Sequence, residues 1–260
     1  MQKKPLLILA ALAVLVVLPV VVAAEMYTGL YIGGNFSADT DPRWEAKKIQ
    51  GTEIPPPIPV RTFTANNISV DPAFVIGGKI GYWFSREGFL SFDYPDWMKY
   101  LGLEIALDYH NLDWPRQNVT INPINLRIPI ENDGYMVTAC FLLMGRYGFL
   151  PDKDVPFGRL QPYVGIGPAV VFTRTHLNIG RDYKSSEADL GFALETGVRY
   201  MVRKNISLSA SFRYRYVRIH VDVDDQVFNI PFQPPYGGVY IPMYTTYNLF
   251  NILVGAAYHF

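Results

Sequence analysis

The last fourteen residues, YNLFNILVGAAYHF, alternate between two kinds of side chain, and this alternation limits the possible fold more than any other feature. Side chains of an extended strand point to opposite faces in turn, so every second residue shares a face. The second face is smaller and carries polar groups such as Asn251 and His259. The first face has aromatic rings at both ends and aliphatic residues between them: Phe250, Ile252, Val254, Ala256, Tyr258 and Phe260. Rings at headgroup level with hydrocarbon between them are typical of a strand that faces lipid.

Seven further segments alternate in the same way. A polar, charged inner face against an apolar outer face is the reverse of a soluble barrel. After Ala24 no apolar run is long enough for a membrane helix, and lipid offers no partners for unpaired backbone groups. The sequence therefore predicts an all-β fold, an eight-stranded antiparallel up-and-down transmembrane β-barrel. Before the last strand, the expected strands are Tyr27–Phe36, Phe74–Phe84, Leu101–Leu112, Tyr135–Phe149, Leu160–Thr173, Leu190–Met201 and Ile206–Val217.

The first 24 residues, Met1 to Ala24, have the organisation of a signal peptide. Lys3 and Lys4 give a positive start, an apolar run follows, and small residues end it at Ala24. The alternative is an uncleaved transmembrane helix, because the apolar run is about long enough to span a bilayer. Either way the chain leaves the cytoplasm. We expect one barrel domain, residues 25–260, after cleavage.

Composition excludes several kinds of function. The net charge is zero, which argues against a nucleic-acid partner. The single cysteine, Cys140, cannot form an internal disulfide. No zinc-ligand spacing and no phosphate-binding loop is present in the sequence, so we expect neither a metal nor a cofactor.

Three stretches, YTGLYIGGNF, PYVGIGPAVVF and VGAAYHF, resemble the small eight-stranded outer-membrane β-barrels. That family includes the opacity proteins and the transmembrane domain of outer-membrane protein A. The terminal Phe260, with Tyr258 two places earlier, resembles the C-terminal signal that the barrel-assembly machinery reads in this family. The resemblance implies a place in the outer membrane of a Gram-negative-type bacterium, among outer-membrane lipid and lipopolysaccharide. Members of the family are structural surface proteins or adhesins, and a few are enzymes.

The connections between the expected strands alternate in length, which fixes an orientation. With the N-terminus in the periplasm, connections after odd-numbered strands are external and should be long. The segment Ser85–Tyr100 is a periplasmic connection rich in aromatic residues, including Trp97, and we expect it to lie on the membrane interface. The other short connections are Leu150–Arg159 and Arg203–Asn205. The long ones are Ser37–Pro72, Asp113–Gly134, His176–Asp189 and Arg218–Thr246.

We expect a structural or surface-interaction protein that is not an enzyme, such as a surface antigen. Asp108 and His110 share an inner face, where a carboxylate and a base could pair, but no serine stands at a nucleophile-like position. Lipid A deacylases of this barrel class use a His-x-Ser arrangement on a late strand, whereas His220 is followed by Val221 and Asp222. We assign no catalytic residue. An enzyme acting on lipid A or other envelope substrates is the first alternative, and a narrow, porin-like passive pore is the second.

The acidic segment around Asp222, Asp224 and Asp225 could hold a divalent cation. We favour solvated carboxylates, or carboxylates that share cations with lipopolysaccharide, and assign no metal site.

The lumen of an eight-stranded barrel is only wide enough for side chains, so we expect charged residues to fill it. Glu195 should contact Arg213 or Arg215 on the next strand, and Glu104 and Asp108 should lie beside Lys79 and Arg146. The expected network is Lys79, Glu104, Asp108, Arg146, Glu195, Arg199, Arg213 and Arg215.

The long segment Arg218–Thr246 is the expected external binding surface for a ligand. It combines rigid aromatic rings with prolines, a composition that binding surfaces favour. An extension of the membrane girdle is the alternative interpretation. The rings concerned are Phe228, Phe232, Tyr236, Tyr240 and Tyr244.

Overall fold

The computed structural model describes residues 25–45, 47–48, 62–84, 94–179, 182–221, 239–240 and 243–260. The expected signal peptide, residues 1–24, lies outside this part of the chain. Within the described residues, none of the helical structure is long and apolar enough to cross a membrane.

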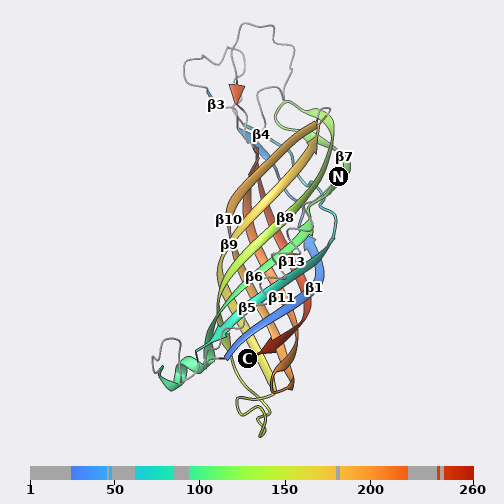
Figure 1. Cartoon of the computed structure of the whole chain (residues 1–260). Helices are drawn as coiled ribbons and strands as arrows, with labels where there is room; N and C mark the ends of the chain where they lie inside the picture. Colours follow the sequence, from blue (N-terminus) through green and yellow to red (C-terminus); the bar gives the residue numbers. More distant parts are fainter. Residues whose placement is uncertain are drawn as a thin grey trace.

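Among the described residues, eight strands form a closed antiparallel ring (Figure 1). The last strand pairs with the first, so that the ring has no open edge. The expected all-β, eight-stranded up-and-down barrel is confirmed. The strands are β1 (Glu25–Ser37), β5 (Ala73–Trp83), β6 (Leu101–Asn111), β8 (Leu126–Arg146), β9 (Leu160–Asn178), β10 (Asp182–Arg203), β11 (Ile206–Val221) and β13 (Met243–His259).

The register of the strands fixes the width of the barrel. A path that starts at Asn35 of β1 and steps from each residue to its register partner on the next strand goes once round the ring. It comes back to β1 at Glu25, ten residues before its start. This offset tilts the strands against the barrel axis, and with eight strands it leaves an interior that side chains can fill.

The alternation of the strands divides outer from inner side chains as expected. On β13, Ile252 and Val254 are 60% and 52% exposed, whereas Asn251 between β1 and β11 is buried. Exposed apolar side chains of this kind form a band round the barrel, which we call the lipid section. Its last outward-facing apolar residues toward the end with the long connections include Phe172 on β9, Leu190 on β10 and Tyr216 on β11.

Several strands continue beyond the lipid section, where the sequence predicted connections. The range Asp113–Gly134 contains β7 (Trp114–Ile121) and the start of β8, and His176–Asp189 is mostly a continuation of β9 and β10. Strands β11 and β13 likewise extend into the range expected to be the binding loop. These boundaries were wrong because the continuations keep the alternation but exchange which face is apolar.

The continued strands form an external section built from two sheets. Pairing between β10 and β11 ends at Gly191 and Val217, so the ring divides there. One sheet contains β7, β8, β9 and β10; the other contains β11, β13, β2 (Arg43–Glu45) and β4 (Thr62–Thr64). A separate short pair joins β3 (Lys47–Lys48) to β12 (Val239–Tyr240). Both sheets contribute to one buried apolar cluster, which includes Trp44, Phe63, Trp114, Ile130, Leu177, Ile219 and Met243.

At the opposite end, which we call the short-turn end, the two connections that the structure describes in full are short. Lys204 and Asn205 form the turn between β10 and β11, as expected. In the connection of residues 150–159, Arg159 forms an ion pair with Asp152, and this hydrogen bond lowers the pKa of the Asp152 carboxyl. A short 3-10 helix, η2 (Asp96–Tyr100), precedes β6.

Candidate functional site: the charged lumen

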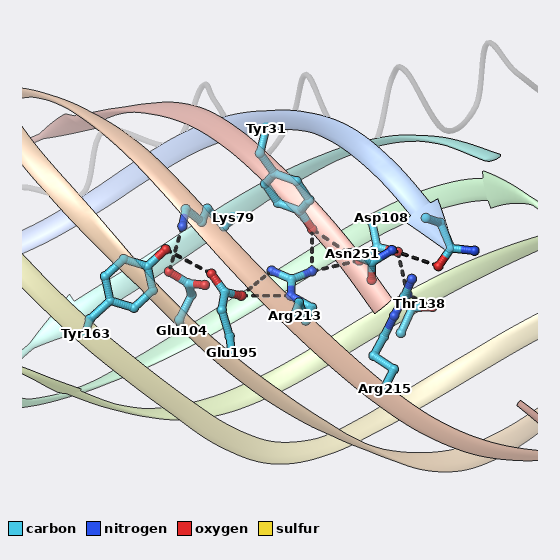
Figure 2. A network of polar contacts seen from close by, with 11 residues as sticks. Tyr31, Lys79, Glu104, Asp108, Thr138, Tyr163, Glu195, Arg213, Arg215 and Asn251 are labelled. Carbon is cyan, nitrogen blue, oxygen red and sulfur yellow. Dashed lines mark hydrogen bonds and ion pairs between the residues drawn. The ribbon is translucent and has the colours of Figure 1, made fainter. Parts of the chain in front are cut away.

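The candidate site is the charged interior of the lipid section (Figure 2). Strand alternation turns all of the expected network residues inward, and none is more than 6% exposed. These residues come from β5, β6, β8, β10 and β11. Burying ionised groups in this way requires close partners, because their desolvation costs several kcal/mol each.

Glu195 on β10 and Arg213 on β11 form the first contact of the network. They are direct register partners, and Nε and Nη2 of Arg213 each lie 2.7 Å from Oε2 of Glu195. The hydroxyl of Tyr163 on β9 donates to Oε1 of Glu195 at 3.0 Å. Hydrogen bonds between ionised partners are about twice as strong as neutral ones, so Glu195 is strongly bound to Arg213.

Asp108 is bound from the far side of the lumen. Its strand, β6, lies opposite β11 in the ring, with three strands between them in either direction. Nη1 of Arg213 donates to Oδ2 of Asp108 at 2.8 Å, and Nη1 of Arg215 donates to Oδ1 at 2.6 Å. Arg215 Nη1 also donates to the hydroxyl of Thr138 at 2.6 Å. The expectation that Asp108 would lie beside Lys79 and Arg146 was wrong, because the narrow lumen lets arginines reach across it.

Glu104 contacts the neighbouring strand instead. Its Oε2 lies 3.4 Å from Nζ of Lys79 on β5, and it accepts a hydrogen bond from the hydroxyl of Tyr27. Arg213 Nη1 donates to the hydroxyl of Tyr31 at 3.1 Å. Figure 2 shows two neighbouring groups of contacts: Lys79 pairs with Glu104, and a longer chain runs from Tyr163 through Glu195 and Arg213 to Asp108. Lys79 Nζ lies 5.6 Å from the ring centre of Tyr163, which brings the two groups together.

Sequence reasoning missed the lumen tyrosines Tyr27, Tyr31 and Tyr163. Two of them rest on glycines of the adjacent strand. A Cβ atom at Gly81 would lie 2.2 Å from the Tyr27 ring, and one at Gly77 would lie 2.4 Å from the Tyr31 ring. The sequence did contain a signal for these tyrosines: inward-facing tyrosines on β1 are paired with inward-facing glycines on β5, which leave room for the rings in the lumen.

Arg146 and Arg199 contact aromatic rings near the short-turn end. The guanidinium carbon of Arg146 lies 4.2 Å from the Trp83 ring centre and 4.1 Å from that of Phe157. The guanidinium carbon of Arg199 lies 4.3 Å from the ring centre of Tyr27. Desolvated cation–π contacts of this kind contribute roughly 2 kcal/mol each. The network is therefore continuous with an aromatic layer below it.

The catalytic candidates are held in other contacts. Asp108 binds the two arginines, and Nδ1 of His110 lies 2.8 Å from the backbone oxygen of Asn111. A serine–histidine contact that the sequence did not suggest joins Ser207 Oγ to His259 Nε2 at 2.8 Å, with both residues buried. No group of three or more His, Cys, Asp or Glu suited to a metal occurs among the described residues.

The terminal aromatic pair faces outward and closes the ring. Tyr258 and Phe260 are 46% and 54% exposed, and their rings meet edge to face at 5.2 Å. The Phe260 N–H donates to the backbone oxygen of Met26 at 3.0 Å. The last residue thus contributes to the closing seam as well as to the lipid-facing surface.

The expected external binding residues are only partly within the described chain. Phe228, Phe232 and Tyr236 lie outside it, as do Asp222, Asp224 and Asp225. Tyr240 is in β12, where it pairs with Lys47, and its side chain is not described. Tyr244 belongs to β13, and its ring stacks on that of His220 at 5.0 Å. The assignment of Tyr244 to a loop was wrong.

The chain belongs to the outer membrane protein β-barrel domain family, whose profile matches residues 9–260. It is an outer-membrane protein. Such barrels have short periplasmic turns and longer external loops, so the short-turn end faces the periplasm.

Among solved structures, the outer membrane protein OprG of Pseudomonas aeruginosa is 14% identical over 91% of this chain and 97% of its own, with a TM-score of 0.51. A major outer membrane protein of Thermus thermophilus is 13% identical over 92% of this chain and 100% of its own, with a TM-score of 0.45. The likeness to OprG supports the fold alone. The comparison with curated proteins gives no match.

Proposed function

We propose that this protein is a closed outer-membrane barrel with a structural or surface-interaction role, and neither a passive pore nor an enzyme. The observation that supports this most directly is the bridge from Asp108 to Arg213 and Arg215, which crosses the lumen between opposite strands. A solute would have to displace these ion pairs in order to pass.

A second barrier lies above the charged one. The connection between β1 and β5 contributes Trp44, Phe63 and Ile68 to the buried core of the external section, and all three are at most 7% exposed. An ion that passed the charged network would meet apolar side chains without partners for its charge. The two barriers together favour a closed barrel over a narrow pore.

The outer surface suggests the membrane partners of the proposed role. Directly beyond the apolar band, Arg174 on β9 and Arg218 on β11 continue the outward-facing rows that end in Phe172 and Tyr216. Cations at this height suit the phosphate groups of lipopolysaccharide. The outward-facing pair Tyr258 and Phe260 supports a role as the signal that the assembly machinery reads. A surface ligand would bind the external section, which lies beyond the lipid section.

Two assays separate this proposal from its alternatives. Purified protein in liposomes should admit no small sugars or amino acids, and a deletion strain should keep the lipid A mass profile of its parent. Solute uptake by the wild-type protein would support the pore instead. A changed lipid A profile that only the intact gene restores would support the enzyme.

A further inference from the structure

The helix η2 (Asp96–Tyr100) extends sideways from the barrel, and its last residues reach the barrel mouth, where Arg146 Nε donates to the backbone oxygen of Lys99 at 3.4 Å. Figure 1 shows it displaced sideways from the wall, level with the ends of the strands, whereas the connection of residues 150–159 extends downward along the barrel axis. The height of η2 is therefore that of the periplasmic membrane surface.

Trp97 on η2 differs from every other tryptophan of the chain. It is 60% exposed, whereas Trp44, Trp83 and Trp114 are at most 2% exposed. An indole ring combines a large apolar surface with one N–H donor, which makes the lipid headgroup region its preferred place in membrane proteins. An exposed tryptophan at this height indicates a lipid contact.

Aromatic contacts connect η2 to the lipid section without a break. Tyr100 stacks on Tyr147 of the rim at 5.8 Å, with the two ring planes 8° apart. Tyr147 is 55% exposed and contacts Phe149 at 5.0 Å, which is 48% exposed. The surface around Trp97 thus continues the band that already faces lipid.

Lys99 adds a charge that suits the same surroundings. Its ammonium lies 5.3 Å from the centre of the Tyr100 ring, and the residue is exposed. Lysine side chains lay their apolar stems along such surfaces while the charge reaches phosphate or water.

We propose that η2 is a membrane-contacting foot that binds phospholipid on the periplasmic leaflet of the outer membrane. Trp97 inserts between the headgroups, and Lys99 contacts lipid phosphate. The contact goes beyond the proposed structural or surface role, because it adds a lipid-binding element outside the strands and facing the periplasm.

Fluorescence of Trp97 tests the foot directly. The Trp97 signal is the difference between the emission of the wild-type protein and that of Trp97→Phe, both folded in phosphatidylcholine vesicles. We expect this signal to lose most of its intensity when the lipid carries bromine near the top of the acyl chains. It should change little on addition of aqueous iodide.

A tryptophan in the axial connection is the matched control. Lys153→Trp, made in the Trp97→Phe background, places an indole at an exposed site of the segment that extends away from the membrane. Its emission should fall with iodide and not with brominated lipid. If Trp97 behaves like this control, or is shielded from both quenchers, the foot does not bind phospholipid. Heat-modifiable migration on a gel confirms that each variant is folded.

Discussion

The lipid section and the external section of this barrel share the same strands but reverse the chemistry of their two faces. On β9, Ile166 and Phe172 point outward and are 47% and 50% exposed. Further along the same outward row come Arg174 and His176, while Leu177 points inward and is buried. The period of two continues through the change. Alternating side chains are common to both sections of the strand. Whether the apolar side chains face outward or inward depends on whether lipid or water surrounds the section.

The interiors of the two sections are filled in correspondingly different ways. The interior of the lipid section contains ion pairs. Its apolar side chains face outward to the lipid, and the lumen is narrow enough for charged side chains on opposite strands to form ion pairs. The external section is surrounded by water and buries an apolar core between two sheets, as a soluble protein does. The two interiors should therefore respond differently to mutation.

The largest expected effect is that of Arg213→Ala. This change leaves Glu195 without its arginine and removes one of the two arginines from Asp108, and breaking a buried ion pair costs about 3–5 kcal/mol. Equilibrium unfolding in urea, with the protein in lipid vesicles, should show a loss of this size. Arg174→Ala, on the outer surface of β9, is the control and should stay within about 0.5 kcal/mol of wild type. Equal losses in both variants would mean that the lumen network has no special part in stability.

Trp44→Ala should have an effect of similar size that is confined to the external section. Truncating a buried aromatic residue costs about 3–5 kcal/mol, because it leaves a cavity. When proteases are added to intact cells, we expect them to cleave the external section of the variant faster than that of the wild-type protein. The heat-modifiable migration of the barrel on a gel should stay as in wild type. Loss of the folded barrel would show that the two sections unfold as one unit.

Glu195→Ala should destabilise the barrel less than Arg213→Ala. Arg213 keeps its bond to Asp108 in this variant, so only part of its hydrogen bonding is lost. We expect a loss of about 1–3 kcal/mol, the usual effect of leaving one buried partner unsatisfied. Urea unfolding of Glu195→Ala and Arg213→Ala under the same conditions compares their losses of unfolding free energy. A larger loss in Glu195→Ala would mean that Arg213 is not the residue on which the stability of the network mainly depends.

Gly81→Ala should destabilise the lipid section by no more than Glu195→Ala does. The added methyl group would meet the Tyr27 ring and weaken its contact with Glu104, and overpacking typically costs about 1–3 kcal/mol. Gly145→Ala is the control, since the nearest atom to its new Cβ would be Val164 Cγ1 at an ordinary 3.7 Å. Similar stability of the two variants in urea would mean that the ring of Tyr27 moves without loss.

Much of the lipid section could be predicted, because a lipid-facing strand has one apolar and one polar face and the two are easy to tell apart. Leu103 and Glu104 on β6 are an example: one is 51% exposed and the other is buried. The pairing of Glu195 with Arg213 followed from their places on adjacent strands. The bridge from Asp108 to Arg215 did not, since it depends on the width and shear of the closed ring.

The external section was harder to predict for a physical reason. Beyond Phe172 the outward-facing residues of β9 become polar, while the inward-facing residues Thr175 and Leu177 are buried. A prediction that follows the outward apolar row therefore ends the strand too early. The burial of Trp44 and Phe63 depends on contacts between segments that are distant in sequence. Nothing in the local pattern around Trp44 and Phe63 specifies that these two residues join the buried core of the external section.

Electrical recording from single barrels in a planar lipid bilayer tests the central claim most directly, namely that the ion pairs across the lumen close it. The account predicts no stable conductance from the wild-type protein. It also predicts that Asp108→Ala, which removes the carboxylate shared by Arg213 and Arg215, gives at least intermittent openings when it is combined with Trp44→Ala in the apolar barrier above. A large and steady conductance from the wild-type protein, unchanged in Asp108→Ala, would contradict it.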